Sequence, residues 1–251
     1  MCDVCGCGDK SVPVEVHDRI LSGNDRQAGH NREHFVDAGV LAINVMGSPG
    51  AGKTALLEAT ARHFGKGRLG ALAGDLATEN DANRLTAAGI PALSITTGSA
   101  CHLDADMVHH ALHHFPWADL DFLFVENVGN LVCPAVYDLG QAANVVLLAA
   151  HEGEDKPLKY PVMFNKADLV VITKFDLVPS LDIDLDLIER NIATVMPAPQ
   201  VFRVSAKTGV GIGLWVEWLE ARRPQKAAAG NHGGHHHHHD DGSHHAQHHH
   251  S

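Results

Sequence analysis

The sequence predicts an α/β fold in which helices cover both faces of a mostly parallel sheet. Seven short apolar runs alternate with segments long enough to form helices, and strands that are apolar on both faces are typical of a sheet buried on both sides. The first run also leads into a glycine-rich loop at residues 47–54, which a helix-like segment follows. The runs that we expect to form strands are residues 40–46, 69–73, 92–95, 122–125, 145–149, 169–172 and 201–204.

The overall composition limits the class of protein. The chain has 251 residues, of which 45% are hydrophobic, and a formal net charge of −11 at pH 7. The apolar fraction suffices for one sizeable core, whereas the acidic balance argues against nucleic acid as a partner. No apolar run approaches the ~18–20 residues that span a bilayer, and the first residues lack the apolar segment of a signal peptide. We therefore expect a cytoplasmic protein without a membrane partner.

Changes in composition divide the chain into three zones. We expect residues 1–37 to form an N-terminal cysteine-rich metal-binding segment, with a possible amphipathic stretch at residues 14–21. Residues 38–223 carry all seven apolar runs and form the predicted α/β domain. Residues 224–251 are a low-complexity tail rich in histidine, which has almost nothing to bury and should be disordered without metal.

The glycine-rich loop, Gly47-Ser48-Pro49-Gly50-Ala51-Gly52-Lys53-Thr54, has the G-x-x-x-x-G-K-T pattern of a Walker A phosphate-binding loop. Its glycines allow a tight turn whose backbone N–H groups face phosphates, and the helix that follows adds the positive end of its dipole. We expect Lys53 to reach the outer phosphates and Thr54 to offer its hydroxyl to Mg²⁺. The residues assigned to this nucleotide site are Gly47, Gly50, Gly52, Lys53, Thr54 and Ala55.

A second motif concerns the nucleotide base. Guanine is read by an N/T-K-x-D element whose Asp accepts from the ring N–H and the exocyclic amine, a pair that adenine does not supply. Two segments match, Asn165-Lys166-Ala167-Asp168 and Thr173-Lys174-Phe175-Asp176. We favour the second because it follows the more convincing buried strand, and we interpret the first as an ordinary polar loop. The residues expected at the base are Lys174 and Asp176, with Ser205, Ala206 and Lys207 from an S-A-K element at the next strand end.

Together these segments make the sequence resemble the HypB family, the GTPases that incorporate nickel into hydrogenase. The resemblance covers most of the chain in an ordered series of segments, which makes it specific. Besides the loops at residues 47–54, 173–176 and 205–207, it rests on Cys2-Asp3-Val4-Cys5-Gly6-Cys7, Gly74-Asp75-Leu76-Ala77-Thr78, Asp81-Ala82, Gly98-Ser99-Ala100-Cys101-His102-Leu103 and Glu126-Asn127-Val128-Gly129-Asn130-Leu131-Val132-Cys133-Pro134.

The resemblance implies a P-loop GTPase of the SIMIBI type, a class that dimerises when nucleotide binds. It also implies that Asp75 lies in the first switch region near Mg²⁺, Glu126 at the Walker B strand end and Gly129 in the second switch. The residues themselves support Glu126, because a carboxylate at the tip of a buried strand near Thr54 can position Mg²⁺. Asp75 on its own fits a helix cap or a loop acid as well. The expected catalytic residues are thus Lys53, Thr54, Asp75 and Glu126.

Two features depart from the family pattern. The guanine motif begins with Thr173 where family members usually have Asn, so we expect weaker organisation of this loop rather than loss of GTP binding. The histidine-rich segment lies at the C-terminus instead of beside the N-terminal cysteines. Its uneven runs, broken by Asp240-Asp241-Gly242-Ser243, favour a native tail over an expression tag.

Three zones are candidates for binding a metal ion, and the first is Cys2, Cys5 and Cys7. Gly6 and Gly8 let this short segment fold tightly around one ion, and thiolates suit Ni²⁺ and Zn²⁺. The resemblance implies a tight nickel site here. A zinc knuckle or a redox-sensitive cluster is the alternative.

The second candidate is Cys101, His102 and Cys133, which follow strands at the edge where parallel α/β sheets bind ligands. Cys133 comes four residues after Gly129, so movement of the second switch should shift a metal ligand. The resemblance implies a GTP-sensitive site for Ni²⁺ or Zn²⁺ at a dimer interface. Either cysteine alone could also be a small buried apolar residue.

The third candidate is the C-terminal tail, whose imidazoles suit Ni²⁺, Zn²⁺ and Cu²⁺ and should hold several ions loosely. Elsewhere, the pairs at residues 109–110 and 113–114 place histidines four residues apart. For these we favour a solvated helix face, because no carboxylate partner is visible in the sequence. The tail residues assigned to metal are His235, His236, His237, His238 and His239.

These observations favour a GTP-hydrolysing metallochaperone that delivers Ni²⁺ during maturation of nickel–iron hydrogenase. We expect slow hydrolysis, because no arginine finger or catalytic glutamine stands out. The resemblance implies a GTP-promoted homodimer, nickel-insertion partner proteins and the hydrogenase large subunit as partners. Two alternatives remain: a nickel store with a vestigial GTPase unit, and a sister GTPase that serves urease, against which the cysteine cluster argues.

Overall fold

The computed structural model describes residues 14–65, 67–75, 79–98 and 100–224, and within them seven strands form one sheet. The strand order is β3-β2-β4-β1-β5-β6-β7, and every neighbouring pair runs parallel. The cysteines before residue 14 and the histidine tail lie outside the described residues. The strands are β1 (Leu41–Gly47), β2 (Leu69–Asp75), β3 (Ala92–Thr96), β4 (Phe122–Glu126), β5 (Ala143–Ala149), β6 (Leu169–Thr173) and β7 (Val201–Arg203).

All seven predicted strands are confirmed, each with ends within two residues of the prediction. The apolar runs located them well because the central strands are buried along their whole length: every residue of β1, β4 and β6 is buried. Such strands read as continuous apolar segments rather than alternating ones.

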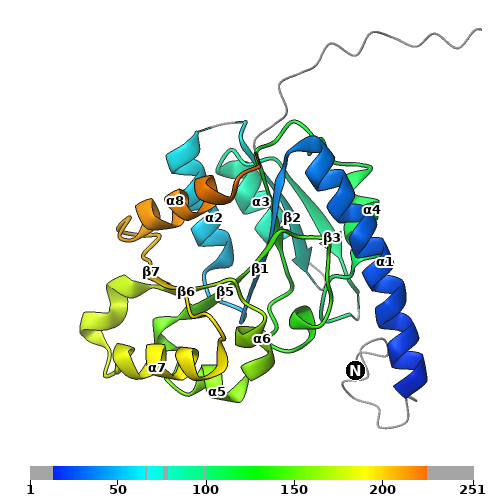
Figure 1. The fold of residues 1–251 in the computed structure, drawn as a ribbon. Coiled ribbons are helices and arrows are strands. Elements are labelled where there is room, and N and C mark those ends of the chain that lie inside the picture. Colours follow the sequence, from blue (N-terminus) through cyan, green and yellow to red (C-terminus); the bar gives the residue numbers. More distant parts are fainter. Residues whose placement is uncertain (1–13, 66, 76–78, 99, 225–251) are drawn as a thin grey trace, which may run out of the picture.

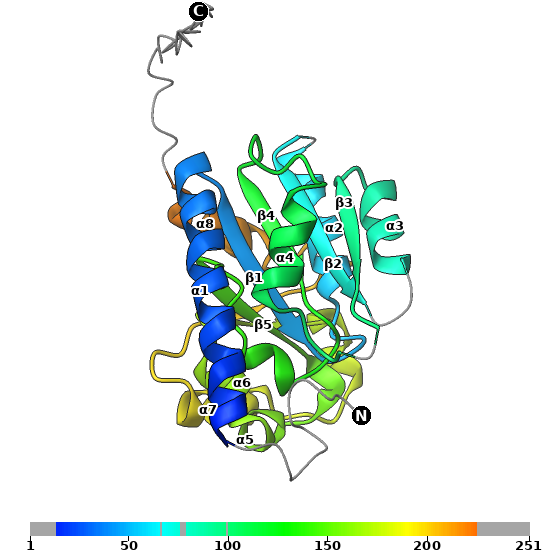
Figure 2. The ribbon, with the colours of Figure 1, turned by 90° about the vertical axis from the view of Figure 1, so that its right-hand side faces the viewer.

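Helices cover both faces of the sheet (Figures 1 and 2). On one face, apolar side chains of three helices pack with those of β1 and β4 in the largest core cluster. On the other face, two separate clusters cover the two halves of the sheet. The first face carries α2 (Lys53–Phe64), α3 (Asn80–Ala87) and α8 (Ile212–Arg222); the second carries α1 (Val14–Ala38), α4 (Ala105–Leu112), α6 (Pro161–Asn165) and α7 (Leu185–Val195). Short helices are η1 (Cys133–Ala135), η2 (Ala150–Glu152), α5 (Lys156–Lys159) and η3 (Phe175–Ser180).

Helix α1 is longer than the possible amphipathic stretch at residues 14–21. It continues to Ala38 because apolar residues recur every seven positions along it. Ala28 and Phe35 are buried, and Leu21 packs against the same core cluster as Phe35. From Leu21 onward, the segment that composition assigned to an N-terminal zone therefore packs against the α/β core.

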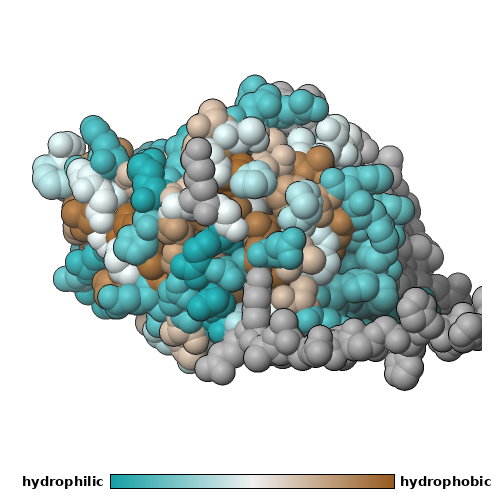
Figure 3. All heavy atoms as spheres, turned by 90° about the horizontal axis from the view of Figure 1, so that it is seen from above, coloured by the Kyte–Doolittle hydropathy of each residue, from teal (hydrophilic) through white to brown (hydrophobic). Residues whose placement is uncertain are grey.

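The carboxyl ends of the parallel strands share one edge of the sheet. In Figures 1 and 2, α1 rises along one side and β1 runs back down, so this edge is the lower one in both views. The opposite end, seen in Figure 3, shows small apolar patches separated by hydrophilic residues where the described residues form the surface. None of the helices in the described ranges is both long and apolar enough to cross a bilayer.

A line of carboxamides crosses the otherwise apolar centre of the sheet. Asn44 of β1 is completely buried and pairs with Asn144 of β5, to whose Oδ1 its Nδ2 donates at 3.1 Å. Its own Oδ1 accepts from Nδ2 of Asn127, which directly follows β4, also at 3.1 Å. Polar groups at this depth must be paired to be tolerated, so the three side chains connect β4, β1 and β5.

Candidate nucleotide and metal site

The phosphate loop (residues 47–54) joins β1 to α2 through backbone conformations that glycine adopts readily. Gly47, Gly50 and Gly52 have φ angles of 151°, 76° and 91°. A Cβ on Gly47 would lie 2.6 Å from the carbonyl oxygen of Leu147, so any side chain there would collide with the backbone of β5. Helix α2 begins at Lys53, and its first N–H groups and positive dipole end therefore face the loop.

Lys53 lies under the phosphate loop rather than in solvent. Its Nζ is 3.4 Å from the carbonyl oxygens of both Gly47 and Ser48, and the residue is 8% exposed. Burial lowers the pKa of Lys53, while the nearby carboxylates, Glu126 first among them, act in the opposite direction. The ammonium therefore sits in a partly desolvated place where an anion would be a stronger partner than two long carbonyl contacts.

Thr54 connects two carboxylates. Its hydroxyl lies 2.7 Å from Oδ1 of Asp81 and 2.9 Å from Oε1 of Glu126, but a hydroxyl carries one hydrogen and can donate to only one of them at a time. Within the described residues, Oε2 of Glu126 accepts no hydrogen bond although the residue is buried. Burial raises the pKa of Glu126 from 4.5 to about 7, even though Lys53 and the bond from Thr54 act against this shift.

This group of oxygens fits Mg²⁺. Hard cations prefer carboxylate and hydroxyl oxygens, and an ion here would satisfy the unpaired oxygen of Glu126 and offset the crowded negative charge. Thr54, Asp81 and Glu126 could hold it directly or through water. Asp81 had no role assigned from the sequence, because only the packing of α3 beside the phosphate loop brings it to Thr54.

A cavity of about 380 Å³ opens over the phosphate loop. Asp75, at the end of β2, and Gly129, three residues after β4, both line it, while their roles in the switch regions stay predictions. A Cβ on Gly129 would lie 2.9 Å from Cγ of Pro49, so only glycine lets this segment approach the phosphate loop so closely. Arg84 of α3 also lines the cavity and pairs with Glu58 at 3.0 Å; no sequence pattern had indicated this arginine.

A second cavity, of about 350 Å³, adjoins the phosphate loop at the base loop (residues 173–176). Thr173 donates through Oγ1 to the carbonyl oxygen of Ala51 at 2.6 Å, which ties the two loops together. Oδ1 of Asp176 accepts from Oγ of Ser205 at 2.6 Å. Lys174 has a φ of 55°, the one positive value at a non-glycine residue in the described chain, and such strain is typical of functional loops. Residues lining this cavity include Gly52, Ala55, Thr173, Lys174, Asp176, Ala206 and Lys207.

The competing guanine motif at residues 165–168 lies away from both cavities. Asn165 ends α6 and donates to the carbonyl oxygen of Val195. Oδ2 of Asp168 accepts from the backbone N–H of Asn144 at 2.7 Å, just before β6 begins. The structure therefore brings residues 173–176, and not residues 165–168, next to the phosphate loop.

Cys101, His102 and Cys133 converge as expected. One potential ligand atom from each lies within 4.8 Å of the others, and the two sulfur atoms are 2.7 Å apart. His102 is 1% exposed and stacks on Tyr137, with ring centroids 3.9 Å apart. Burial lowers the pKa of His102, which favours the neutral imidazole that a metal requires. Two sulfurs and one imidazole suit Zn²⁺ or Ni²⁺ but leave at least one position open.

Asn127 joins the metal cluster to the nucleotide cavity. It directly follows Glu126, and its Oδ1 accepts from the backbone N–H of Leu103 at 3.1 Å and from that of Val128 at 2.9 Å. Leu103 comes directly after His102, and Val128 lines the nucleotide cavity. One buried carboxamide thus holds together the segments that carry the two sites. No local pattern indicated a role for Asn127, since a role of this kind depends on contacts between distant segments.

Comparison with known proteins defines the class. Residues 41–203 match the family described as "CobW/HypB/UreG, nucleotide-binding domain". The match covers all seven strands and both loops at the nucleotide cavities. The chain therefore belongs to this family of nucleotide-binding proteins and has the fold of a P-loop GTPase.

Within that family the chain is a HypB protein, as the sequence resemblance predicted. The "Hydrogenase maturation factor HypB" of Azotobacter vinelandii is 46% identical over 215 residues, which are 85% of this chain and 71% of that protein. The "Hydrogenase/urease maturation factor HypB" of Helicobacter hepaticus is 42% identical over 84% of this chain and 89% of its own length. The crystal structure of HypB from Helicobacter pylori in complex with nickel has a TM-score of 0.75 at 37% identity, covering 82% of this chain and 99% of that one.

Proposed function

We propose that this protein is a GTP-hydrolysing nickel metallochaperone that delivers Ni²⁺ during maturation of nickel–iron hydrogenase. Membership of the HypB family supports both the binding of nickel and the role in hydrogenase maturation. Its relatives are hydrogenase maturation factors, and one of them was solved with nickel. The observation that supports coupling between nucleotide binding and metal binding is the hydrogen bond between Asn127 and Leu103, which links the nucleotide cavity to the metal cluster.

In the proposed GTP complex, the phosphates lie in the larger cavity and the base in the smaller one. Lys53 exchanges its two long carbonyl contacts for phosphate oxygens, and the loop N–H groups hold the chain of phosphates. Asp176, held by Ser205, accepts from the guanine edge, while Lys174 and Lys207 line the same cavity. Bound Mg²⁺ would neutralise the charge that develops on the phosphates, with Thr54, Asp81 and Glu126 as its holders.

Coupling follows from the contacts of Asn127. A γ-phosphate that moves the segment around Val128 and Gly129 also moves the carboxamide that bonds Leu103, and with it the adjoining His102. Cys133, four residues beyond Gly129, belongs to the same segment. Coupling of this kind is reciprocal: if GTP changes the affinity for metal, metal must change the affinity for GTP by the same factor.

A second copy of the chain would complete the metal site in this proposal. The cluster supplies three ligands, whereas Zn²⁺ takes four in structural sites, and symmetric pairing would bring the same ligands from the partner. Val132 and Val136 flank the short helix η1 and are 50% and 41% exposed. They give this region apolar surface for a partner. The proposed dimer would form when GTP orders the switch segments.

The two terminal zones would serve the same task in different ways. Cys2, Cys5 and Cys7 would bind nickel tightly, and His235–His239 with the rest of the tail would hold ions loosely for transfer. Nickel-insertion partner proteins and the hydrogenase large subunit would receive the metal.

A Ni²⁺ titration with and without a non-hydrolysable GTP analogue tests this proposal. It compares the full chain with a Cys2/Cys5/Cys7 triple Ala variant, a Cys101→Ser/Cys133→Ser variant and a chain that ends at Arg223. The analogue should change Ni²⁺ affinity in every form except Cys101→Ser/Cys133→Ser. Identical isotherms across the whole set, with and without the analogue, would remove the metallochaperone function.

Measurement of GTP hydrolysis distinguishes an active GTPase from a nickel storage protein. Lys53→Ala removes the cation beneath the phosphate loop and should abolish GTP hydrolysis above background, while the terminal metal-binding zones stay intact. Equal rates for wild type and Lys53→Ala would favour the store.

A second candidate function is service to urease, because the Helicobacter hepaticus relative bears the name of a hydrogenase/urease maturation factor. Deleting the gene and assaying both enzymes decides between the two. We expect loss of hydrogenase activity; loss of urease activity alone would contradict the assignment to hydrogenase.

A further inference from the structure

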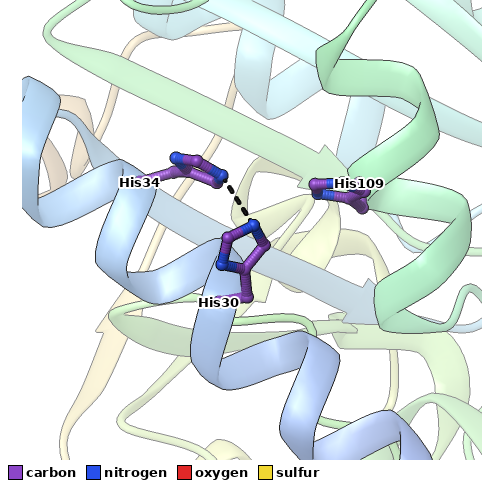
Figure 4. A group of neighbouring side chains, drawn as sticks. All are labelled: His30, His34 and His109. Carbon is purple, nitrogen blue, oxygen red and sulfur yellow. Dashed lines mark hydrogen bonds between the residues drawn. The ribbon is translucent and has the colours of Figure 1, made fainter.

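Three histidines meet where helices α1 and α4 pack together (Figure 4). His30 and His34 come from successive turns of α1, and His109 comes from α4. One ring nitrogen from each lies within 4.8 Å of the others, and the Nε2 atoms of His30 and His34 are 3.1 Å apart. None of the three lines either nucleotide cavity.

The seam between the two helices is held by buried contacts, so the spacing of these rings does not depend on surface side chains alone. Asn31 of α1 is completely buried, and its Nδ2 donates to the carbonyl oxygen of Ala105, the first residue of α4, at 2.8 Å. The same Nδ2 donates to the carbonyl oxygen of Leu139 at 3.2 Å. Phe35 and Val108 pack in one core cluster. The histidines therefore sit on a preformed scaffold.

Asn31 also determines which nitrogen of His109 is available. Since its Nδ2 already donates to two carbonyls, its Oδ1 is the acceptor, and that oxygen lies 3.1 Å from Nδ1 of His109. A neutral His109 therefore carries its hydrogen on Nδ1 and keeps the lone pair of Nε2 for another partner. A buried group that fixes one imidazole nitrogen in this way is typical of histidines that bind metal through the other.

The sequence favoured a solvated helix face for the histidines at 109–110 and 113–114, and the structure separates them. His109 is half-buried against α1, whereas His110 is exposed and lies 3.6 Å from the carboxylate of Asp106. His113 follows one helical turn after His109, and their Nε2 atoms are 3.2 Å apart. A fourth imidazole is thus within reach of the cluster.

We propose that His30, His34 and His109 form a metal site for a divalent first-row transition cation, with His113 or water completing the coordination. Histidines four residues apart on a helix can chelate one ion, as His30 and His34 are placed to do. Imidazole suits Zn²⁺, Ni²⁺ and Cu²⁺. Burial, together with the neighbouring histidines, lowers the pKa of His109, which favours the neutral imidazole that a metal requires.

This site differs from the cluster at Cys101 in chemistry and in purpose. Its ligands are all nitrogens, and they come from two helices that the described contacts join through Asn31 rather than through the switch segments. An ion bound across the two helices would tie α1 to α4 and stabilise the folded chain. Its occupancy should therefore not depend on nucleotide.

Trp117 offers a local signal for this site. Its ring centroid lies 6.5 Å from that of His34 and 5.4 Å from that of Phe35. The other two tryptophans, Trp215 and Trp218, belong to α8 and are buried on the opposite face of the sheet. Ni²⁺ bound at the histidines should quench the emission of Trp117, and Zn²⁺, which does not quench, should displace Ni²⁺ and restore it.

The experiment is a Ni²⁺ fluorescence titration of the full chain without nucleotide, with a Trp117→Phe variant to subtract the other tryptophans. We expect His30→Gln/His34→Gln to raise the Ni²⁺ concentration at half-quenching by about tenfold or more. The matched control, His110→Gln/His114→Gln, removes one imidazole of α4 and one just after it, both outside the cluster, and should leave the midpoint unchanged. Cys101→Ser/Cys133→Ser should also leave it unchanged, which separates this proposal from the GTP-linked site.

Equal midpoints for wild type and His30→Gln/His34→Gln would overturn the proposal, as would an equal shift in the His110→Gln/His114→Gln control. Metal-free thermal unfolding by circular dichroism checks that the variants fold alike. If the double variant unfolds early, His34→Gln alone replaces it, because the contact between His34 and His30 is exposed and its loss should not affect the core.

Discussion

The carboxamide oxygen of Asn127 accepts a hydrogen bond from the backbone N–H of Leu103 at 3.1 Å. This bond joins the segment that follows β4 to the segment that carries Cys101 and His102. Because Asn127 is buried and also bonds Val128 and Asn44, neither segment can shift without disturbing the other.

Asn127→Ala should therefore weaken the coupling between nucleotide and metal. The substitution leaves the N–H groups of Leu103 and Val128 without their acceptor and should destabilise the protein by about 1–3 kcal/mol. Ni²⁺ affinity without nucleotide should persist, while its response to a GTP analogue should shrink. Chemical denaturation and Ni²⁺ titration measure the two effects. Asn165→Ala, which removes an exposed bond to Val195, is the control and should retain the full response.

Glu126→Gln should change how stability depends on pH. Burial raises the pKa of Glu126 from 4.5 to about 7, so between these values the folded chain binds more protons than the unfolded one. The free energy of unfolding of the nucleotide-free protein therefore falls as pH rises through this window, by about 3 kcal/mol in all. A glutamine does not titrate, so this part of the pH dependence should vanish.

Urea unfolding from about pH 5 to about pH 8 measures this effect. Glu217→Gln, at an exposed carboxylate of α8, is the matched control and should keep the wild-type slope. Above pH 7 the Glu126→Gln variant should be the more stable protein and yet hydrolyse GTP poorly. If the Glu126→Gln variant kept the wild-type slope, burial would not raise the pKa of Glu126 in the folded protein.

Gly47→Ala should destabilise the chain even without ligand. Its φ of 151° is one that alanine rarely adopts, and the added Cβ would lie 2.6 Å from the carbonyl oxygen of Leu147. We expect a loss of more than about 1 kcal/mol. Gly213→Ala is the control: Gly213 lies within α8 with open space around it, so alanine should stabilise the protein by about 0.5–1 kcal/mol. Two denaturation curves decide the matter, since the predicted changes have opposite signs.

Asp176→Asn should weaken GTP binding by at least about tenfold, because an amide cannot accept from both guanine N–H groups as a carboxylate can. Asp168→Asn makes the same chemical change in the competing motif and should leave GTP affinity unchanged, since Asp168 bonds the backbone of Asn144 away from both cavities. Titration with a fluorescent GTP analogue compares them. If Asp168→Asn caused the larger loss, the assignment of the base loop would be reversed.

What the sequence could predict depended on local pattern. The strands and the phosphate loop follow from short stretches of neighbouring residues, and each appears where it was expected. Between the two guanine motifs, the strand context favoured the one that lies beside the phosphate loop, through the bond between Thr173 and Ala51.

The features that could not be predicted from the sequence depend on tertiary contacts. Asp81 reaches Thr54 only because α3 packs against α2, and His30 meets His109 only because α1 packs against α4. Nothing in the spacing of 79 residues between His30 and His109 could show that they are neighbours. The full length of α1 was missed for a related reason, because its buried positions are few and separated by polar residues.

The carboxamides of Asn44, Asn127 and Asn144 act on assembly as well as on the finished fold. In the parallel register of the sheet, Asn44 stands opposite Asn144. Sliding β1 by one residue against β5 would turn Asn44 to the other face of the sheet and separate its carboxamide from those of Asn127 and Asn144, at a cost that a purely aliphatic strand would not incur. Pairing of the three carboxamides therefore favours the observed register of the sheet over shifted registers that the surrounding valines, leucines and isoleucines would tolerate.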